Sequence, residues 1–176
     1  MDRIGFGSNT SLIAVYVEKR PLIPEYQSFQ DYRPLLPNEI EFINNRAGNG
    51  WRKLFNVYAK IIEAINLPGF ESEKIRSWQQ YRDTHLLKSS GQEALLFSPP
   101  RFSRDSTIHI IAGRTYAKKL INEGKLCCSL IWLNEEFAID KENKLIICPF
   151  FDYRQLSNTK IDYLKTLIDE LCLAQI

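Results

Sequence analysis

Four short runs of mostly apolar residues limit what this chain can fold into, because they do not alternate with polar residues. The runs cover residues 12–17, 94–97, 108–112 and 145–147. A strand that has no polar face is typical of a parallel sheet whose two sides are both covered by helices. We therefore expect these runs to be buried strands of an α/β protein.

Helical patterns separate the four runs. The clearest covers residues 51–66, where apolar side chains recur every three or four positions. Further helices are predicted over residues 38–48, 72–87, 114–124 and 158–171. Strands that are separated by helices pair in parallel through right-handed crossovers.

The order of elements predicts one α/β domain over residues 1–176, a three-layer α-β-α sandwich with a small, mostly parallel sheet of about four or five strands. A strand over residues 126–133 and a hairpin turn at residues 140–143 complete the sheet. We expect residues 1–11 to be flexible. The four prolines of residues 21–37 predict a long loop without regular structure.

Composition excludes several classes of protein. The formal net charge is only +2, so the global charge does not predict binding to nucleic acid or membranes, and any basic patch has to be local. Four cysteines without a Cys-x-x-Cys pair and only two histidines are a poor ligand set, and we expect no metal and no cofactor. The sequence has no signal peptide and no apolar run of about 20 residues, which predicts a cytoplasmic protein with free thiols and no membrane partner. The oligomeric state stays open.

Charged and aromatic residues follow each predicted strand. In parallel α/β sheets ligands bind beyond the carboxyl ends of the strands, so these residues should meet at one edge. Arginine binds phosphate with two hydrogen bonds, and aromatic rings stack on bases. We therefore predict that this edge binds a single-stranded nucleic acid or a nucleotide-like anionic ligand. The predicted ligand-binding residues are Arg20, Arg101, Arg114, Thr115, Phe150, Tyr153 and Arg154.

Other interpretations fit the same residues. The arginines could pair with carboxylates such as Asp105, and Phe150 or Phe151 could close the end of the sheet. Asp152 or Glu18 could instead act as the general base of a divergent hydrolase. A protein-interaction module is a third alternative, and its expected mark is a large exposed apolar patch.

The order of elements and several short motifs resemble the uracil-DNA glycosylase-like superfamily. Arg20–Pro21 stands where members carry a catalytic Asp or Asn before Pro, and Asn45–Arg46 with Trp51 is similar to the Asn-Arg-Phe-Trp motif. The stretch IIAGRTYAKKL at residues 110–120 resembles the Gly-containing turn between strand and helix, and Cys148–Pro149 stands in place of His-Pro. The resemblance implies a small parallel sheet between helices.

Two positions depart from that family. Arg20 replaces the residue that orients or activates water, and Cys148 replaces the histidine that stabilises the departing base. We therefore expect the fold without glycosylase activity. Only Pro149 and Leu156, the latter as a wedge into a nucleic-acid groove, carry over from the resemblance.

Overall fold

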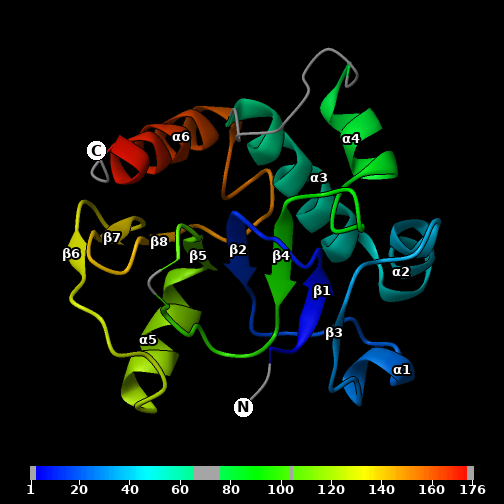
Figure 1. Cartoon of the computed structure of the whole chain (residues 1–176), viewed down its shortest axis with the longest axis horizontal. Helices are drawn as coiled ribbons and strands as arrows, with labels where there is room; N and C mark the ends of the chain where they lie inside the picture. Colours follow the sequence, from blue (N-terminus) through cyan, green and yellow to red (C-terminus); the bar gives the residue numbers. More distant parts are fainter. Residues whose placement is uncertain (1–2, 66–75, 104, 174–176) are drawn as a thin grey trace.

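A mixed β-sheet runs through the part of the chain that the computed structural model describes, residues 3–65, 76–103 and 105–173 (Figure 1). Its eight strands among these residues are β1 (Gly5–Gly7), β2 (Ile13–Tyr16), β3 (Tyr32–Arg33), β4 (Glu93–Leu96), β5 (Ile108–Ala112), β6 (Ile131–Trp132), β7 (Ala138–Asp140) and β8 (Leu145–Cys148). They lie in the order β3-β1-β4-β2-β5-β8-β7-β6.

The four predicted apolar runs form the centre of this sheet. Strands β4, β2, β5 and β8 are parallel, with Val15 opposite both Leu95 and Ile110. Every residue in these strands is buried, which confirms the α/β class.

The predicted number of strands and the predicted mostly parallel pairing are wrong. β1 is antiparallel to β4, and the hairpin strands β7 and β6 run antiparallel to their neighbours, so the sheet is mixed. The added strands have only two or three residues each. β7 and β6 fall on or next to the predicted hairpin turn and strand, whereas β1 and β3 are too short to carry a periodicity that a sequence pattern could detect.

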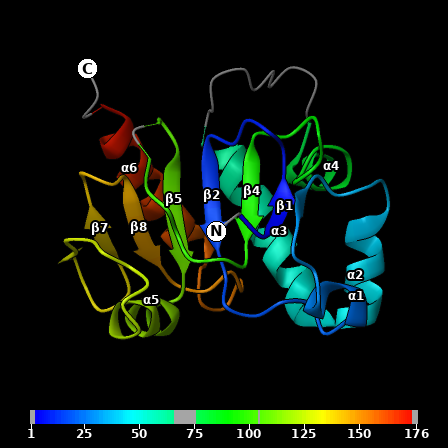
Figure 2. The ribbon, with the colours of Figure 1, turned by 60° about the horizontal axis from the view of Figure 1, so that its bottom comes forward.

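Helices cover both faces of the sheet. They are α1 (Pro24–Gln27), α2 (Glu39–Ala47), α3 (Asn49–Ala64), α4 (Trp78–Thr84), α5 (Arg114–Asn122) and α6 (Asn158–Leu173). The apolar sides of α3 and α6 pack with Val15, Ile110 and Ile146 on one face. α5 packs with Ile111 and Ile147 on the other face, which gives three layers (Figures 1 and 2).

Within residues 1–11, which are predicted to be flexible, Gly5–Gly7 form the strand β1. Gly5 and Gly7 have φ values of +152° and +155°, which disfavour other residues. A Cβ atom on Gly7 would lie 2.6 Å from the Glu93 carbonyl oxygen and 2.8 Å from Ala94 Cα. The two glycines therefore allow the backbone of β1 to approach β4 closely.

Residues 21–37 also contain regular structure, contrary to the prediction. They form α1 and the edge strand β3. Pro24 occupies the first turn of α1, where its missing N–H costs no hydrogen bond. Proline therefore begins a helix here instead of preventing one.

The carboxylate of Glu39 at the start of α2 connects this region to the core. It accepts hydrogen bonds from Tyr26 Oη at 2.8 Å and from the Leu36 backbone N–H at 2.8 Å. Arg33 adds two more, at 2.9 and 2.7 Å. Four hydrogen bonds on one buried carboxylate hold the proline-containing segment against the domain.

Two other predicted elements are only partly present. Residues 126–133 contribute just Ile131–Trp132 to the sheet, and Cys127 before them is exposed. The helix expected over residues 72–87 is seen as α4, while residues 66–75 lie outside the described part of the chain. None of the helices described here is long and apolar enough to cross a bilayer.

Candidate functional site

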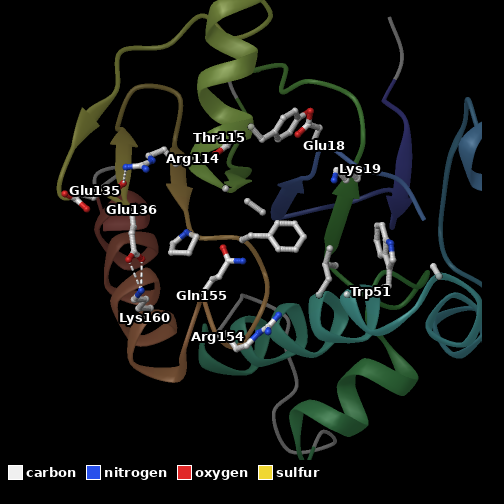
Figure 3. Close-up of a pocket in the computed structure, with 18 residues that line it drawn as sticks. Glu18, Lys19, Trp51, Arg114, Thr115, Glu135, Glu136, Arg154, Gln155 and Lys160 are labelled. Atoms are coloured by element: carbon white, nitrogen blue, oxygen red, sulfur yellow. Dashed lines mark hydrogen bonds and ion pairs between the residues drawn. The ribbon is translucent and has the colours of Figure 1, made fainter. Parts of the chain in front are cut away.

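A cleft of about 900 Å³ opens at the carboxyl ends of the central strands. From β2 the chain crosses to β4 on one side, and from β5 it crosses to β8 on the other. Because these two connections leave in opposite directions, a crevice opens between the carboxyl ends of β2 and β5. Glu18 and Lys19 after β2, Gly113 and Arg114 after β5, and Pro149 after β8 line the cleft (Figure 3).

The opposite wall comes from α3 and the segment that precedes α6. Trp51 and Leu54 on α3, Phe150 and Gln155 after β8, and Lys160 on α6 line this side. Trp51 is half-buried and its ring centroid lies 5.8 Å from that of Phe55 and 6.3 Å from that of Phe97. The cleft therefore combines an aromatic wall with several charged groups.

Two of the four predicted arginines meet in this cleft, together with Thr115 of α5. Arg114 Nη1 donates to the carbonyl oxygen of Glu135 at 2.9 Å. Arg154 lies 2.9 Å from the carboxylate of Asp152. The predicted positive edge is therefore partly present.

Lys19 and Lys160 also line the cleft. The sequence places Lys19 at this edge, after the first strand, but not among the predicted ligand-binding residues, and it does not predict Lys160. Lys160 Nζ pairs with Glu136 at 2.7 Å. Lys19 is exposed and makes no hydrogen bond or ion pair with the rest of the described chain.

Arg20 does not reach the cleft, contrary to the prediction. Its guanidinium donates to the carbonyl oxygens of Tyr26 at 3.1 Å and Gln27 at 3.2 Å, and also to that of Phe29. These acceptors lie in and after α1, so Arg20 fixes that short helix next to the end of β2. Its Nη1 group therefore donates within the fold, and the side chain does not line the cleft.

Arg101 lies in a different place from the other predicted arginines. It lines two hollows together with Tyr16, whose side chain belongs to the core on the α5 face of the sheet. Pro99 and Pro100 direct the chain there after β4, and Arg101 does not line the cleft. The prediction that four arginines converge is wrong because the chain leaves β4 toward that face.

Asp152 is poorly placed for the predicted role of a general base. Its carboxylate accepts from the Arg154 backbone N–H at 2.9 Å and from Arg154 Nε at 3.2 Å, and it lies 3.5 Å from Lys53 Nζ. The bonds from Arg154 hold the pKa of Asp152 well below its usual range. Asp152 does not line the cleft.

Glu18, the other predicted base, does line the cleft but is exposed and pairs with Lys119 on α5. Of the two carboxylates, only Glu18 could contact a ligand bound there.

The aromatic residues after β8 divide into three environments. Phe151 is fully buried with its ring edge against Tyr58, so it is the one that closes the end of the sheet. Phe150 is half-buried and lines the cleft. Tyr153 is exposed outside the cleft, with Lys53 Nζ 5.5 Å from its ring centroid.

The two positions carried over from the glycosylase resemblance also differ. Pro149 lines the cleft, as a residue at the end of the last parallel strand should. Leu156 is completely buried in the core, so it cannot serve as a wedge into a nucleic-acid groove in this structure.

The two histidines lie away from the cleft. His109 is buried in β5 as predicted, with Nδ1 2.7 Å from Tyr16 Oη. Burial lowers the pKa of His109 to about 4. In the described ranges, no three or more His, Cys, Asp or Glu side chains are grouped so that they could hold a metal ion.

Comparison with known proteins places the chain in a family without giving it a function. No curated protein and no solved structure matches it significantly, so the glycosylase-like resemblance stays a prediction. A family model matches residues 4–169. The chain therefore belongs to DUF6942, a family of unknown function.

Proposed function

We propose that the cleft binds an anionic ligand with a planar base, either a nucleotide or a single strand of nucleic acid. The observation that carries this proposal is that Trp51 and Phe150 line the same cleft as Lys19, Arg114 and Arg154. Aromatic stacking and positive charge together are the chemistry by which proteins bind single strands.

The charges of the cleft favour an anion. Lys119 and Lys160 neutralise Glu18 and Glu136, and Asp152 neutralises Arg154. Two cations, Lys19 and Arg114, then face the one remaining carboxylate of the lining, Glu135, so a balance of +1 remains. Within the described part of the chain, Arg114 bonds only a neutral carbonyl, so its other N–H groups stay available for a phosphate.

The arrangement also provides a place for the base. Phe55 and Phe97 support the ring of Trp51, so a base that stacks on this ring meets a fixed surface. The Gln155 side chain in the same lining has both a donor and an acceptor for the edge of a base. The first N–H groups of α5, at Arg114 and Thr115, are placed for a phosphate at the start of the helix.

The glycosylase-like resemblance supports the same class of partner. Arg20 and Cys148 in place of the catalytic residues support binding without base excision. The four free cysteines support a reducing compartment such as the cytoplasm.

A protein-interaction module is the second candidate, and one observation favours it. The edge strand β6 and the next residue expose Ile131 at 60%, Trp132 at 39% and Leu133 at 40%. Apolar side chains exposed next to one another on an edge strand offer a surface for a protein partner. A sedimentation measurement that finds a monomer at high concentration would remove self-association from this alternative.

The test is the binding of a fluorescent single-stranded oligonucleotide, followed by anisotropy, with nucleoside monophosphates as competitors. The double variant Arg114→Ala/Arg154→Ala should weaken binding at least about tenfold and reduce its dependence on salt. Lys19→Ala/Arg114→Ala repeats the test without exposing Asp152. Arg46→Ala/Lys141→Ala removes the same charge from exposed positions outside the cleft lining and should bind nearly as the parent does. Equal affinity in all four proteins would end the proposal.

A further inference from the structure

A second polar hollow lies on the α5 face of the sheet, away from the cleft. α5 packs on β5 and β8. Over β2 and β4, the loop that joins β4 to β5 packs on this face instead. Two adjoining spaces of about 450 and 240 Å³ share Arg3, Tyr16 and Arg101 as lining residues. No residue of the described chain lines both these spaces and the cleft.

A buried pair of side chains forms the floor of the larger space. Tyr16 Oη and His109 Nδ1 are 2.7 Å apart, and the two residues are only 2% and 5% exposed. The ring of Phe102 packs edge to face with the imidazole, with 5.1 Å between the two ring centroids. Among the described residues, no group forms a hydrogen bond with His109 Nε2, although the side chain lines the space.

The protonation of this pair turns Nε2 into a donor. Burial lowers the pKa of His109 to about 4 and raises the pKa of Tyr16 well above its usual value, so both groups are neutral near pH 7. We assign the Tyr16 hydroxyl as the donor to Nδ1, because a phenol is a stronger donor than an imidazole N–H, and this tautomer carries the imidazole proton on Nε2. The charged groups that act on the pKa of His109 are Asp105, which raises it, and Lys144, which lowers it.

Positive charge surrounds the same space. Arg3 lies with its guanidinium carbon 4.1 Å from the centroid of the Tyr32 ring, and its Nη1 is 3.4 Å from Ser11 Oγ. Arg101 is exposed and makes no ion pair with any described residue. Lys125 at the smaller space is paired with Glu123 at 2.8 Å, so the free positive charge of the hollow comes from the two arginines.

One carboxylate faces the space but its oxygens are engaged. Asp105 accepts from Ser103 Oγ at 2.5 Å and from the Thr107 backbone N–H at 3.0 Å, which orders the loop. Cationic donors therefore exceed acceptors around the hollow.

We propose that this hollow binds the phosphate group of a small organic phosphate, held by Arg3 and Arg101 with a hydrogen bond from His109 Nε2. Two guanidinium groups and an imidazole N–H offer more donors than a carboxylate can use, whereas a tetrahedral phosphate has enough oxygens. The larger space exceeds the size of phosphate alone, so it has room for the organic part of the ligand. This site is independent of the proposed function of the cleft.

The chain offers a direct probe, because His85 and His109 are its only histidines. The imidazole signals are followed by NMR, with His85→Gln to assign them, while inorganic phosphate, ribose 5-phosphate or acetate is added at constant ionic strength. We expect a saturable shift of the His109 signals with the two phosphates and a much weaker response to acetate. The His85 signals should stay constant, since that side chain lines none of these spaces.

Variants complete the test. Arg3→Ala/Arg101→Ala should weaken the response of His109 to phosphate at least about tenfold, while His109 keeps its low pKa as a sign of intact folding. Lys19→Ala/Arg114→Ala in the cleft should leave this response unchanged. The proposal is overturned if His109 shows no saturable shift with either phosphate, if acetate binds as well, or if the Arg3/Arg101 variant responds as the parent does.

Discussion

Tyr81 Oη lies 2.6 Å from Glu93 Oε2 in the interior of the protein, and this hydrogen bond connects α4 to β4. Glu93 is fully buried and also accepts from the backbone N–H groups of Leu87 at 2.7 Å and Gln92 at 3.0 Å. All three of these groups donate to the Glu93 carboxylate, so the side chain at this position has to supply acceptors. Helix α4 is held to the sheet by a polar contact.

Glu93→Gln should destabilise the fold by about 2 to 4 kcal/mol, because the amide NH2 group would face a backbone N–H donor that then loses its acceptor. The free energy of unfolding in urea measures this. Glu63→Gln on the exposed side of α3 is the matched control and should change the free energy by less than about 0.5 kcal/mol. A similar small effect at both positions would contradict the role given to Glu93.

His109 should make stability depend on pH. Its pKa is about 4 in the folded protein and ordinarily about 6.5, so the folded state binds fewer protons between these values. Stability contributed by the neutral imidazole is present above about pH 6.5 and is lost as the pH falls toward 4, by up to about 3 kcal/mol. Urea unfolding at several pH values should show this slope, and His109→Gln should remove most of it. If the pH dependence remains in His109→Gln, it comes from groups other than His109.

Arg20 should act on stability and not on the cleft. Arg20→Ala removes the donor to three carbonyl oxygens in and after α1, which we expect to cost about 1 to 3 kcal/mol. Thermal unfolding reports the loss, and Arg46→Ala, an exposed arginine at the end of α2, is the comparison. If Arg20→Ala kept full stability but lost binding in the cleft, the original prediction from the sequence would be restored.

Gly7 should tolerate no side chain. Gly7→Ala places a Cβ within 2.6 Å of the Glu93 carbonyl oxygen at a φ of +155°, so we expect a loss of at least about 2 kcal/mol. Gly50→Ala in α3, where nothing lies within 4 Å of the added Cβ, should instead be neutral or stabilise by up to about 1 kcal/mol. Equal effects of the two substitutions in a urea titration would show that β1 can move away from β4.

The sequence predicted the elements whose side chains repeat. The apolar runs of β2, β4, β5 and β8 and the stripe of α3 are visible without a structure, because burial on one or both faces leaves a long pattern. No sequence pattern predicts β1, because its two glycines have no side chains and its pairing depends on the backbone of β4.

The candidate site was harder to predict for a related reason. The end of a strand sets where the chain leaves the sheet, but the residues that follow set the direction in which the chain continues. Lys19 and Arg114 follow their strands directly and reach the cleft. Arg20 turns back to α1, and Arg101 is directed by Pro99 and Pro100 to the opposite face. Such turns depend on tertiary contacts that no local pattern records.

The central claim, that the cleft binds a base next to its positive charges, has a direct optical test. The chain contains three tryptophans, so Trp78→Phe/Trp132→Phe leaves Trp51 of the cleft as the only one. Titration with a nucleoside monophosphate and with a short single-stranded oligonucleotide should quench the Trp51 fluorescence saturably with at least one of them, because a base stacks on the ring. The quench should be lost when Lys19→Ala/Arg114→Ala is added. Trp51 fluorescence that stays constant with both ligands would contradict the account.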